Sequence, residues 1–364
     1  MTLLFTINAP LSRAVEVEPL VAAGADSFYA GIFPSERIGE LPMIINRRNH
    51  PENNFRSVAE FRAALAISHR LKRDLFVAFN EHFYPPEALS LILELLEELL
   101  GEPGLTGVIV TDIGLLIELG RRYPQLVLVA STGCVIQNSG AASLFTELGV
   151  KRAVLPRSMT LNEIHLLVQA RPDMSFECFV LNDRCPNVDG LCHFVHADFT
   201  ERRFPTQCRF VRLANTHSLG PDSPRHSPRR ASPLSDGDFS RFFGSEPHAC
   251  GACYLPILIR AGVGNMKIVG RDRSLDEKER AVRFLAEART FLMDCLAPHG
   301  DAGSEQVARS RLDSLDFRAF QKRVKALRRS LYAGACSPDL CYYPEPPWPP
   351  SRRASHVSSR SRTK

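Results

Sequence analysis

The sequence predicts an α/β protein of the TIM-like (β/α)8 barrel class. Over the first two-thirds of the 364-residue chain, short runs rich in β-branched residues alternate with longer segments whose apolar residues recur at helical spacing. Eight strand-like runs are present, and strands that alternate with helices pair in parallel through crossover connections. An eightfold βα repeat favours a closed barrel over the alternative, an open doubly wound sheet.

Each expected strand is short, apolar and bounded by turn-forming residues. The eight are Leu3–Asn8, Ser27–Ile32, Leu75–Asn80, Gly107–Asp112, Leu126–Ser131, Arg152–Arg157, Ser175–Leu181 and Asn265–Arg271. Amphipathic helices are expected between them at Val58–Leu71, Pro86–Leu100, Gly114–Arg122, Ser139–Leu148, Leu161–Ala170 and Tyr254–Ala261. After the eighth strand, helices are expected at Leu275–Cys295 and Leu312–Leu331, and the second of these lies in a C-terminal helical extension.

One long insertion, residues 182–252, interrupts the alternation after the seventh strand. A loop of that length inside a compact domain is usually functional or disordered. Its middle, residues 218–240, is rich in Ser, Pro, Arg and Asp, which predicts a flexible segment, whereas its two ends carry cysteines. The expected organisation is a barrel over residues 1–295, a helical extension over 296–343 and a disordered tail over 344–364.

The bulk composition is that of an ordinary globular protein, with 44% hydrophobic and 23% charged residues. The net charge of +5 hints at nucleic acid, but much of the excess lies in two Arg- and Ser-rich stretches, 225–230 and 352–364, that are typical of solvated segments. No signal peptide is apparent, and the apolar stretch 89–100 contains three glutamates. We therefore expect a cytoplasmic protein without a membrane span, whose ten cysteines are reduced thiols.

Five cysteines frame the insertion in the pattern C-x6-C-x15-C-x41-C-x2-C. They are Cys185, Cys192, Cys208, Cys250 and Cys253. Soft thiolates on loops at the mouth of a barrel suit an iron–sulfur cluster, and four thiolates with one C-x2-C pair also suit zinc. Unrelated free thiols are the third reading.

The other cysteines have separate expectations. Cys178 and Cys295 fall inside a strand and a helix and are expected in the core. Cys134 follows the fifth strand, and the late C-x4-C pair, Cys336 and Cys341, is expected to be structural, with a position against the cluster as the alternative.

Several expected strands end in polar residues, namely Asn80, Asp112, Ser131, Arg157 and Arg271. In a βα barrel the carboxyl ends of the strands share one face, where active sites are built. Any single residue of this kind is as readily explained as a helix N-cap or a turn former. Five on one rim favour a functional site.

Five blocks of the sequence, taken in order, resemble the signature blocks of the peptidase U32 family. They are GADSFYAG (24–31), GVIVTDIGLL (107–116), the segment from Ser131 to Asn138, VLPRSMTLNEI (154–164) and GVGNMKIVGR (262–271). The resemblance extends from about residue 1 to residue 295. It implies an oxygen-independent hydroxylase of the ubiquinone pathway or of RNA bases, with an organic oxygen donor such as prephenate and a [4Fe–4S] cluster on four cysteines.

Carried onto this sequence, the resemblance makes Cys185, Cys192 and Cys208 cluster ligands and leaves the fourth open between Cys250 and Cys253. The chain departs from common family patterns at Gly133, Ser158 and Val269. These departures leave the identity of the substrate open, but they do not affect the expected cluster ligands. The residues expected to bind substrate are Arg157, Arg271, Asn138 and Asp112, with Lys267 as a further cation. Arginine suits a dicarboxylate donor because its planar guanidinium pairs with a carboxylate through two hydrogen bonds.

Two other function classes stay open. A collagenase-like peptidase is the family's older label, but the sequence offers no convincing Ser/His/Asp or Cys/His arrangement and no HExxH. A non-catalytic iron–sulfur subunit, paired with another family member, or a structural zinc protein is the third possibility.

Overall fold

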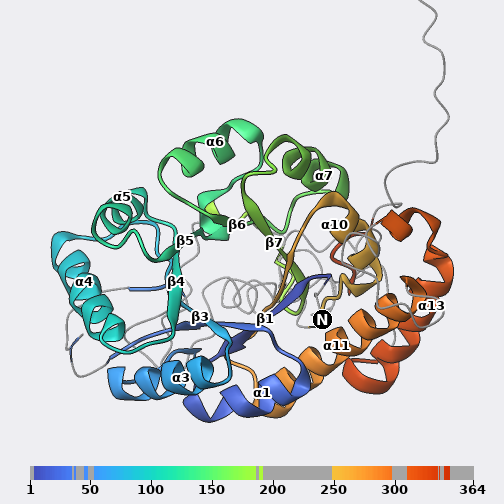
Figure 1. The fold of residues 1–364 in the computed structure, drawn as a ribbon, viewed down its shortest axis with the longest axis horizontal. Helices are drawn as coiled ribbons and strands as arrows, with labels where there is room; N and C mark the ends of the chain where they lie inside the picture. The colour runs from blue at the N-terminus through green and yellow to red at the C-terminus, as the bar shows by residue number, and fades with distance from the viewer. Residues whose placement is uncertain are drawn as a thin grey trace, which may run out of the picture.

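Eight parallel strands close into a barrel in chain order, with β8 hydrogen-bonded to β1 (Figure 1). The computed structural model describes residues 4–34, 37, 45–47, 53–185, 188–191, 248–296, 310–334, 336 and 340–344. The barrel confirms the predicted class, and the doubly wound alternative is wrong. The predicted flexible segment 218–240 lies outside the described residues, as does the predicted tail 344–364 apart from residue 344.

The strands lie within a few residues of the predicted ones. They are β1 (Thr6–Leu11), β2 (Ser27–Gly31), β3 (Asp74–Phe79), β4 (Leu105–Val110), β5 (Val127–Ala130), β6 (Arg152–Val154), β7 (Ser175–Leu181) and β8 (Asn265–Ile268). Both faces of each strand are largely buried, because one face fills the barrel and the other packs against helices. β6 and β8 end earlier than predicted, so the arginines that follow them lie beyond the sheet.

Helices surround the barrel in Figure 1. They are α1 (Val17–Ala23), α3 (Val58–Arg70), α4 (Pro86–Leu100), α5 (Ile113–Arg122), α6 (Ser139–Glu147), α7 (Leu161–Ala170), α10 (Leu255–Ala261), α11 (Leu275–Leu296) and α13 (Phe317–Leu327). Most start at a side-chain N-cap, such as Ser57 before α3 and Thr160 before α7. The sequence prediction missed α1, which is short and carries Pro19 in its first turn, where proline is tolerated.

The predicted last helix, Leu312–Leu331, is divided in the structure. A 3-10 turn (Arg311–Ser314) precedes α13, and a π-helical turn, η7 (Arg328–Tyr332), follows it. Asp316 sets the boundary, because its side chain accepts a hydrogen bond from the amide of Ala319 and so caps α13. α13 packs on the outside of α11 (Figure 1), with the ring of Phe320 stacked on that of Phe291. Among the described residues, no helix combines the length and apolar character needed to cross a membrane.

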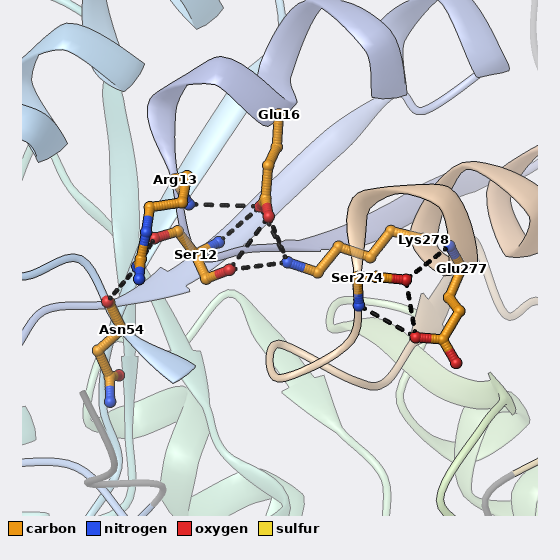
Figure 2. A network of polar contacts seen from close by, with 7 residues as sticks. All are labelled: Ser12, Arg13, Glu16, Asn54, Ser274, Glu277 and Lys278. Atoms are coloured by element: carbon orange, nitrogen blue, oxygen red, sulfur yellow. Dashed lines mark hydrogen bonds and ion pairs between the residues drawn. The ribbon is translucent and has the colours of Figure 1, made fainter. Parts of the chain in front are cut away.

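A buried ion pair joins the start of the barrel to its last helix (Figure 2). Lys278 in α11 donates to both carboxylate oxygens of Glu16, at 2.8 and 2.9 Å, and to the hydroxyl of Ser12 at 2.8 Å. Glu16 also accepts from the backbone amides of Ser12 and Arg13. The side chain of Lys278 is fully buried, so neither charge has water as an alternative partner.

We predict that Lys278→Met lowers the free energy of unfolding by about 3–5 kcal/mol, because it leaves the Glu16 carboxylate buried without a counter-charge. The double variant Glu16→Gln/Lys278→Met should recover part of this loss, since no charge is then buried. Urea unfolding followed by circular dichroism measures both.

The matched control is Arg280→Met on the same helix, whose ion pair with Asp276 is exposed. It should change stability by less than about 0.5 kcal/mol. Equal effects of Lys278→Met and Arg280→Met would contradict the importance of the buried pair.

Candidate functional site

A cavity of about 860 Å³, counting its open mouth, lies at the carboxyl ends of the strands. The residues that line it come from most strands and their following loops: Tyr29, Arg47, Asn53, Ala78, Asn80, Ile109, Ser131, Thr132, Gly133, Val154, Arg157, Phe179, Asp183, Asp189, Lys267, Val269, Gly270, Arg271 and Asp272. This is the face on which βα-barrel enzymes carry their active sites.

Arg157 lies in the cavity wall, as expected from its position after the sixth strand. Its guanidinium pairs with the carboxylate of Asp189 and lies over the ring of Phe179, 4.0 Å from the ring centre. Burial favours the neutral form of Arg157, but the neighbouring Asp189 carboxylate acts against it, and the pKa of Arg157 is raised. The guanidinium is therefore a fixed positive charge whose partner belongs to the segment between Cys185 and Cys192.

Arg271 is the second predicted cation in the cavity. It donates to the side-chain oxygen of Asn54 at 3.0 Å. Gly31 makes room for it, because a Cβ at that position would lie 2.2 Å from the guanidinium. Gly270, the residue before Arg271, has a φ of +113°, which favours glycine. These glycines fall in two of the family-like sequence blocks.

Lys267 points into the barrel and not outward. Its ammonium lies 2.6 Å from Glu177 and 3.7 Å from the ring centre of Tyr29. Glu177 also accepts from the side-chain amide of Asn8 at 3.1 Å. Burial lowers the pKa of Lys267, although Glu177 opposes this effect.

Sequence reasoning missed Glu177. The available signal was a carboxylate at an inward position of an otherwise apolar strand, SFECFVL. Such a residue is almost never fully buried unless it is paired.

Asp112 and Asn138, the other two residues expected to bind substrate, each cap a helix. The side chain of Asp112 accepts from the amide of Leu115 at 2.6 Å, and that of Asn138 from the amide of Ala141 at 2.9 Å. Neither residue lines the cavity. At these two strand ends, local helix capping accounts for the polar residue.

The five cysteines of the insertion are only partly described. Cys185 is half-buried and lies near enough to Arg157 to contribute to the raised pKa of its guanidinium. Cys250 and Cys253 are buried, whereas Cys192 and Cys208 lie outside the described residues. No three Cys, His, Asp or Glu side chains in the described part of the chain are already arranged as a metal site.

The cysteines outside that pattern divide between core and surface. Cys178 is buried in β7, as predicted. Cys295 is exposed on α11, so its expected place in the core is wrong. Cys134 donates from its thiol to the carbonyl of Val110, and burial raises its pKa to about 12, so it is a protonated thiol at neutral pH.

The lining of the cavity thus combines four basic side chains, Arg47, Arg157, Lys267 and Arg271, with three carboxylates, Asp183, Asp189 and Asp272. Each of these cations has an internal partner; for Arg47 it is Glu81 at 3.9 Å. Such a site is suited to an anionic ligand whose carboxylates replace internal acceptors.

Comparison with known proteins identifies the family of the chain. The model of peptidase family U32 matches residues 12–320. The chain is 28% identical over 192 residues to the Escherichia coli 23S rRNA 5-hydroxycytidine C2501 synthase, covering 52% of this chain and 26% of that protein. It is 26% identical over 186 residues to the tRNA hydroxylation protein P of E. coli, covering 51% of this chain and 38% of that protein.

The chain spans less than half the length of these curated relatives. The solved structure of the U32 peptidase Mk0906 matches with a TM-score of 0.46 and 13% identity, over 74% of this chain and 94% of that one, a likeness too low to support an argument. The family model, in contrast, covers most of the chain. The chain therefore belongs to peptidase family U32, as its sequence blocks predicted.

Proposed function

We propose that the chain is an oxygen-independent hydroxylase that modifies an RNA base and takes its oxygen from a small organic dicarboxylate such as prephenate. The observation that carries this proposal is the cavity at the barrel mouth, where Arg157 and Arg271 face one space. Two relatives with RNA-hydroxylation names support the choice of RNA over a quinone precursor. Their partial coverage keeps the substrate a proposal.

In this proposal the two arginines bind the donor. One donor carboxylate replaces Asp189 at Arg157, and the other is held by Arg271, whose position Asn54 fixes. Lys267 lines the same cavity, where its hydrogen bond to Glu177 fixes its position, and it adds positive potential. The ring of Phe179 supports the Arg157 guanidinium, so the guanidinium plane is set before the ligand arrives.

The proposed cofactor is a [4Fe–4S] cluster on Cys185, Cys192 and Cys208, with Cys250 and Cys253 as the sequence candidates for the fourth ligand. Cys185 suits this role because it lies beside the cavity and near the positive charge of Arg157, which favours a thiolate. When bound, the cluster supplies one-electron redox chemistry close to the donor. The short segment from Cys185 to Asp189 would then link cluster and donor site.

A peptidase is the alternative function, and the described residues that line the cavity offer no support for its Cys/His form. Among the described residues that line it there is no histidine or cysteine to act as base or nucleophile. His248 belongs to a different cavity, with Arg273, Glu277 and Tyr332.

Serine at Cys185, Cys192 or Cys208 should abolish the iron, the acid-labile sulfide and the brown colour of anaerobically purified protein, because each substitution removes a cluster ligand. Iron and sulfide analysis measures the loss. Cys295→Ser, which removes an exposed thiol, is the control and should retain both. Active protein that never contains iron would refute the cluster and revive the peptidase.

Arg157→Ala and Arg271→Ala should each weaken prephenate binding roughly 10- to 100-fold, since hydrogen bonds to charged groups contribute about 1.5–3 kcal/mol. Asp189→Asn should tighten binding, because it removes the internal carboxylate that competes for Arg157. Anaerobic calorimetric titration measures all three, with Arg121→Ala on the exposed face of α5 as control. Unchanged affinity in both alanine variants, or loss of iron along with binding, would contradict this role.

A further inference from the structure

Two tyrosines of the C-terminal extension, Tyr342 and Tyr343, are buried against the end of β7. Their exposed fractions are 3% and 5%. Both lie beyond residue 320, where the match to the family model ends. A buried phenol hydroxyl needs hydrogen-bond partners, so the groups that these two hydroxyls contact show what they hold in place.

The hydroxyl of Tyr343 fixes the residue that supports Arg157. It donates to the backbone carbonyl of Phe179 at 3.1 Å. The ring of Phe179 lines the cavity and lies under the Arg157 guanidinium, 4.0 Å from it. Tyr343 therefore holds the backbone of this aromatic support from the side away from the ligand.

The hydroxyl of Tyr342 lies between Arg157 and the turn that follows β7. It donates to the backbone carbonyl of Asn182 and is hydrogen-bonded to the Arg157 guanidinium. A phenol oxygen can donate one hydrogen bond and accept another, whereas a guanidinium only donates, so one hydroxyl serves both groups. Burial raises the pKa of Tyr342, although the charge of Arg157 acts against this effect, so the phenol keeps its proton at neutral pH.

The segment that carries Tyr342 is fixed by its backbone. Cys250 and Cys341 are paired in a parallel β-bridge, in which the amide of Tyr342 donates to the carbonyl of Cys250 at 3.1 Å. A Cβ on Gly251 would lie 2.9 Å from the ring of Tyr343 and 3.2 Å from the Cβ of Tyr342. The two tyrosines therefore pack directly on the glycine, and their position does not depend on the contacts of their hydroxyls.

The other partner of the Tyr342 hydroxyl, Asn182, is equally constrained. Its φ of +66° is in the left-handed region. Its side chain donates to the carbonyl of Val269 at 2.8 Å and accepts from the hydroxyl of Tyr332. The carbonyl that receives the Tyr342 hydroxyl thus has a fixed position, and Tyr342 connects Arg157 to a rigid part of the barrel rim.

Arg157 has one partner that a ligand can replace and two that it cannot. The Asp189 carboxylate is the charged partner, and a ligand carboxylate supplies the same charge and geometry. The Tyr342 hydroxyl and the Phe179 ring are neutral, and they lie outside this exchange. When Asp189 gives way to a ligand, these two contacts still hold the guanidinium.

We propose that Tyr342 is a positioning residue of the cavity, which holds the Arg157 guanidinium in the orientation that receives a ligand carboxylate. The inference rests on the proposed function for the identity of that ligand, the dicarboxylate donor, but not for the contact itself. Tyr342 does not line the cavity. It acts on ligand affinity through Arg157, because a guanidinium that is already oriented loses less freedom on binding.

The test is calorimetric titration of anaerobically purified full-length protein with prephenate and, in parallel, with malonate, a small dicarboxylate. Tyr342→Phe should weaken the binding of both roughly 3- to 10-fold, the effect of one neutral hydrogen bond. The matched control is Tyr332→Phe, which removes a tyrosine hydroxyl from the side chain of the same Asn182. It should change the affinity by less than about 2-fold, as expected of an independent site.

A double-mutant cycle separates positioning from a general loss of structure. In the Arg157→Ala background, Tyr342→Phe should have no further effect on affinity, since Tyr342 acts only through that guanidinium. A general disturbance of the cavity would weaken binding alike in both backgrounds. The same variants, unfolded in urea without ligand, should show non-additive shifts of the unfolding midpoint, because the contact exists before the ligand binds.

The outcomes distinguish this inference from the proposed function. Equal losses of affinity in both backgrounds, additive midpoint shifts, or unchanged affinity in Tyr342→Phe would each overturn the inference and leave the proposed function standing. Binding of malonate but not of prephenate, with the coupling to Arg157 intact, would refute prephenate as the donor and leave Tyr342 in its role. Wild-type protein that binds neither dicarboxylate would overturn both.

Discussion

Pairing of β8 with β1 is the constraint on which the rest of the structure depends. Lys267 of β8 lies beside Glu177 of the neighbouring β7, and closure adds Asn8 of β1, which also donates to Glu177, so a charge and its partners share the barrel interior. The buried contact of Lys278 with Glu16 joins the same two ends of the barrel on its outer side. A closed parallel sheet has no free edge, and every strand must end on one rim. The cavity is a direct result of this geometry.

The charges of the cavity are compensated from inside the protein. Asp189 partners Arg157, Asn54 partners Arg271, and Glu177 partners Lys267. Removal of charged groups from water is costly unless each is paired or hydrogen-bonded, so a cation-lined cavity needs such acceptors in the absence of a ligand. The acceptors differ in one way: Glu177 is buried in a strand, whereas Asp189 lies on the cysteine-bearing segment.

The chain turns sharply where β7 ends, and this turn connects the cavity to the cysteines. Asn182 and Asp183 both adopt the left-handed region, with φ of +66° and +42°, which Asn and Asp tolerate better than most residues. Asn182 donates to the carbonyl of Val269, and Asp183 pairs with Arg273 at 3.1 Å. The backbone amide of Asn182 also donates to the carbonyl of Ala249. The start of the insertion and the residues before Cys250 are thereby held side by side.

The sequence by itself determined the barrel, because period and composition of each element are local properties. Strand-end position also predicted that Arg157 and Arg271 share one face of the barrel, where both line the cavity, since parallel strands must present their carboxyl ends on one face. Local pattern did not separate these arginines from Asp112 and Asn138, because an N-cap and a ligand-binding residue occupy the same place after a strand.

Only the tertiary structure paired Glu177 with Lys267 and brought the late C-x4-C pair against the C-x2-C pair. In both cases the partners are separated by more than eighty residues in sequence. Such contacts arise from the pairing of β7 with β8 and from the bridge between Cys250 and Cys341, and no periodicity within either segment encodes them.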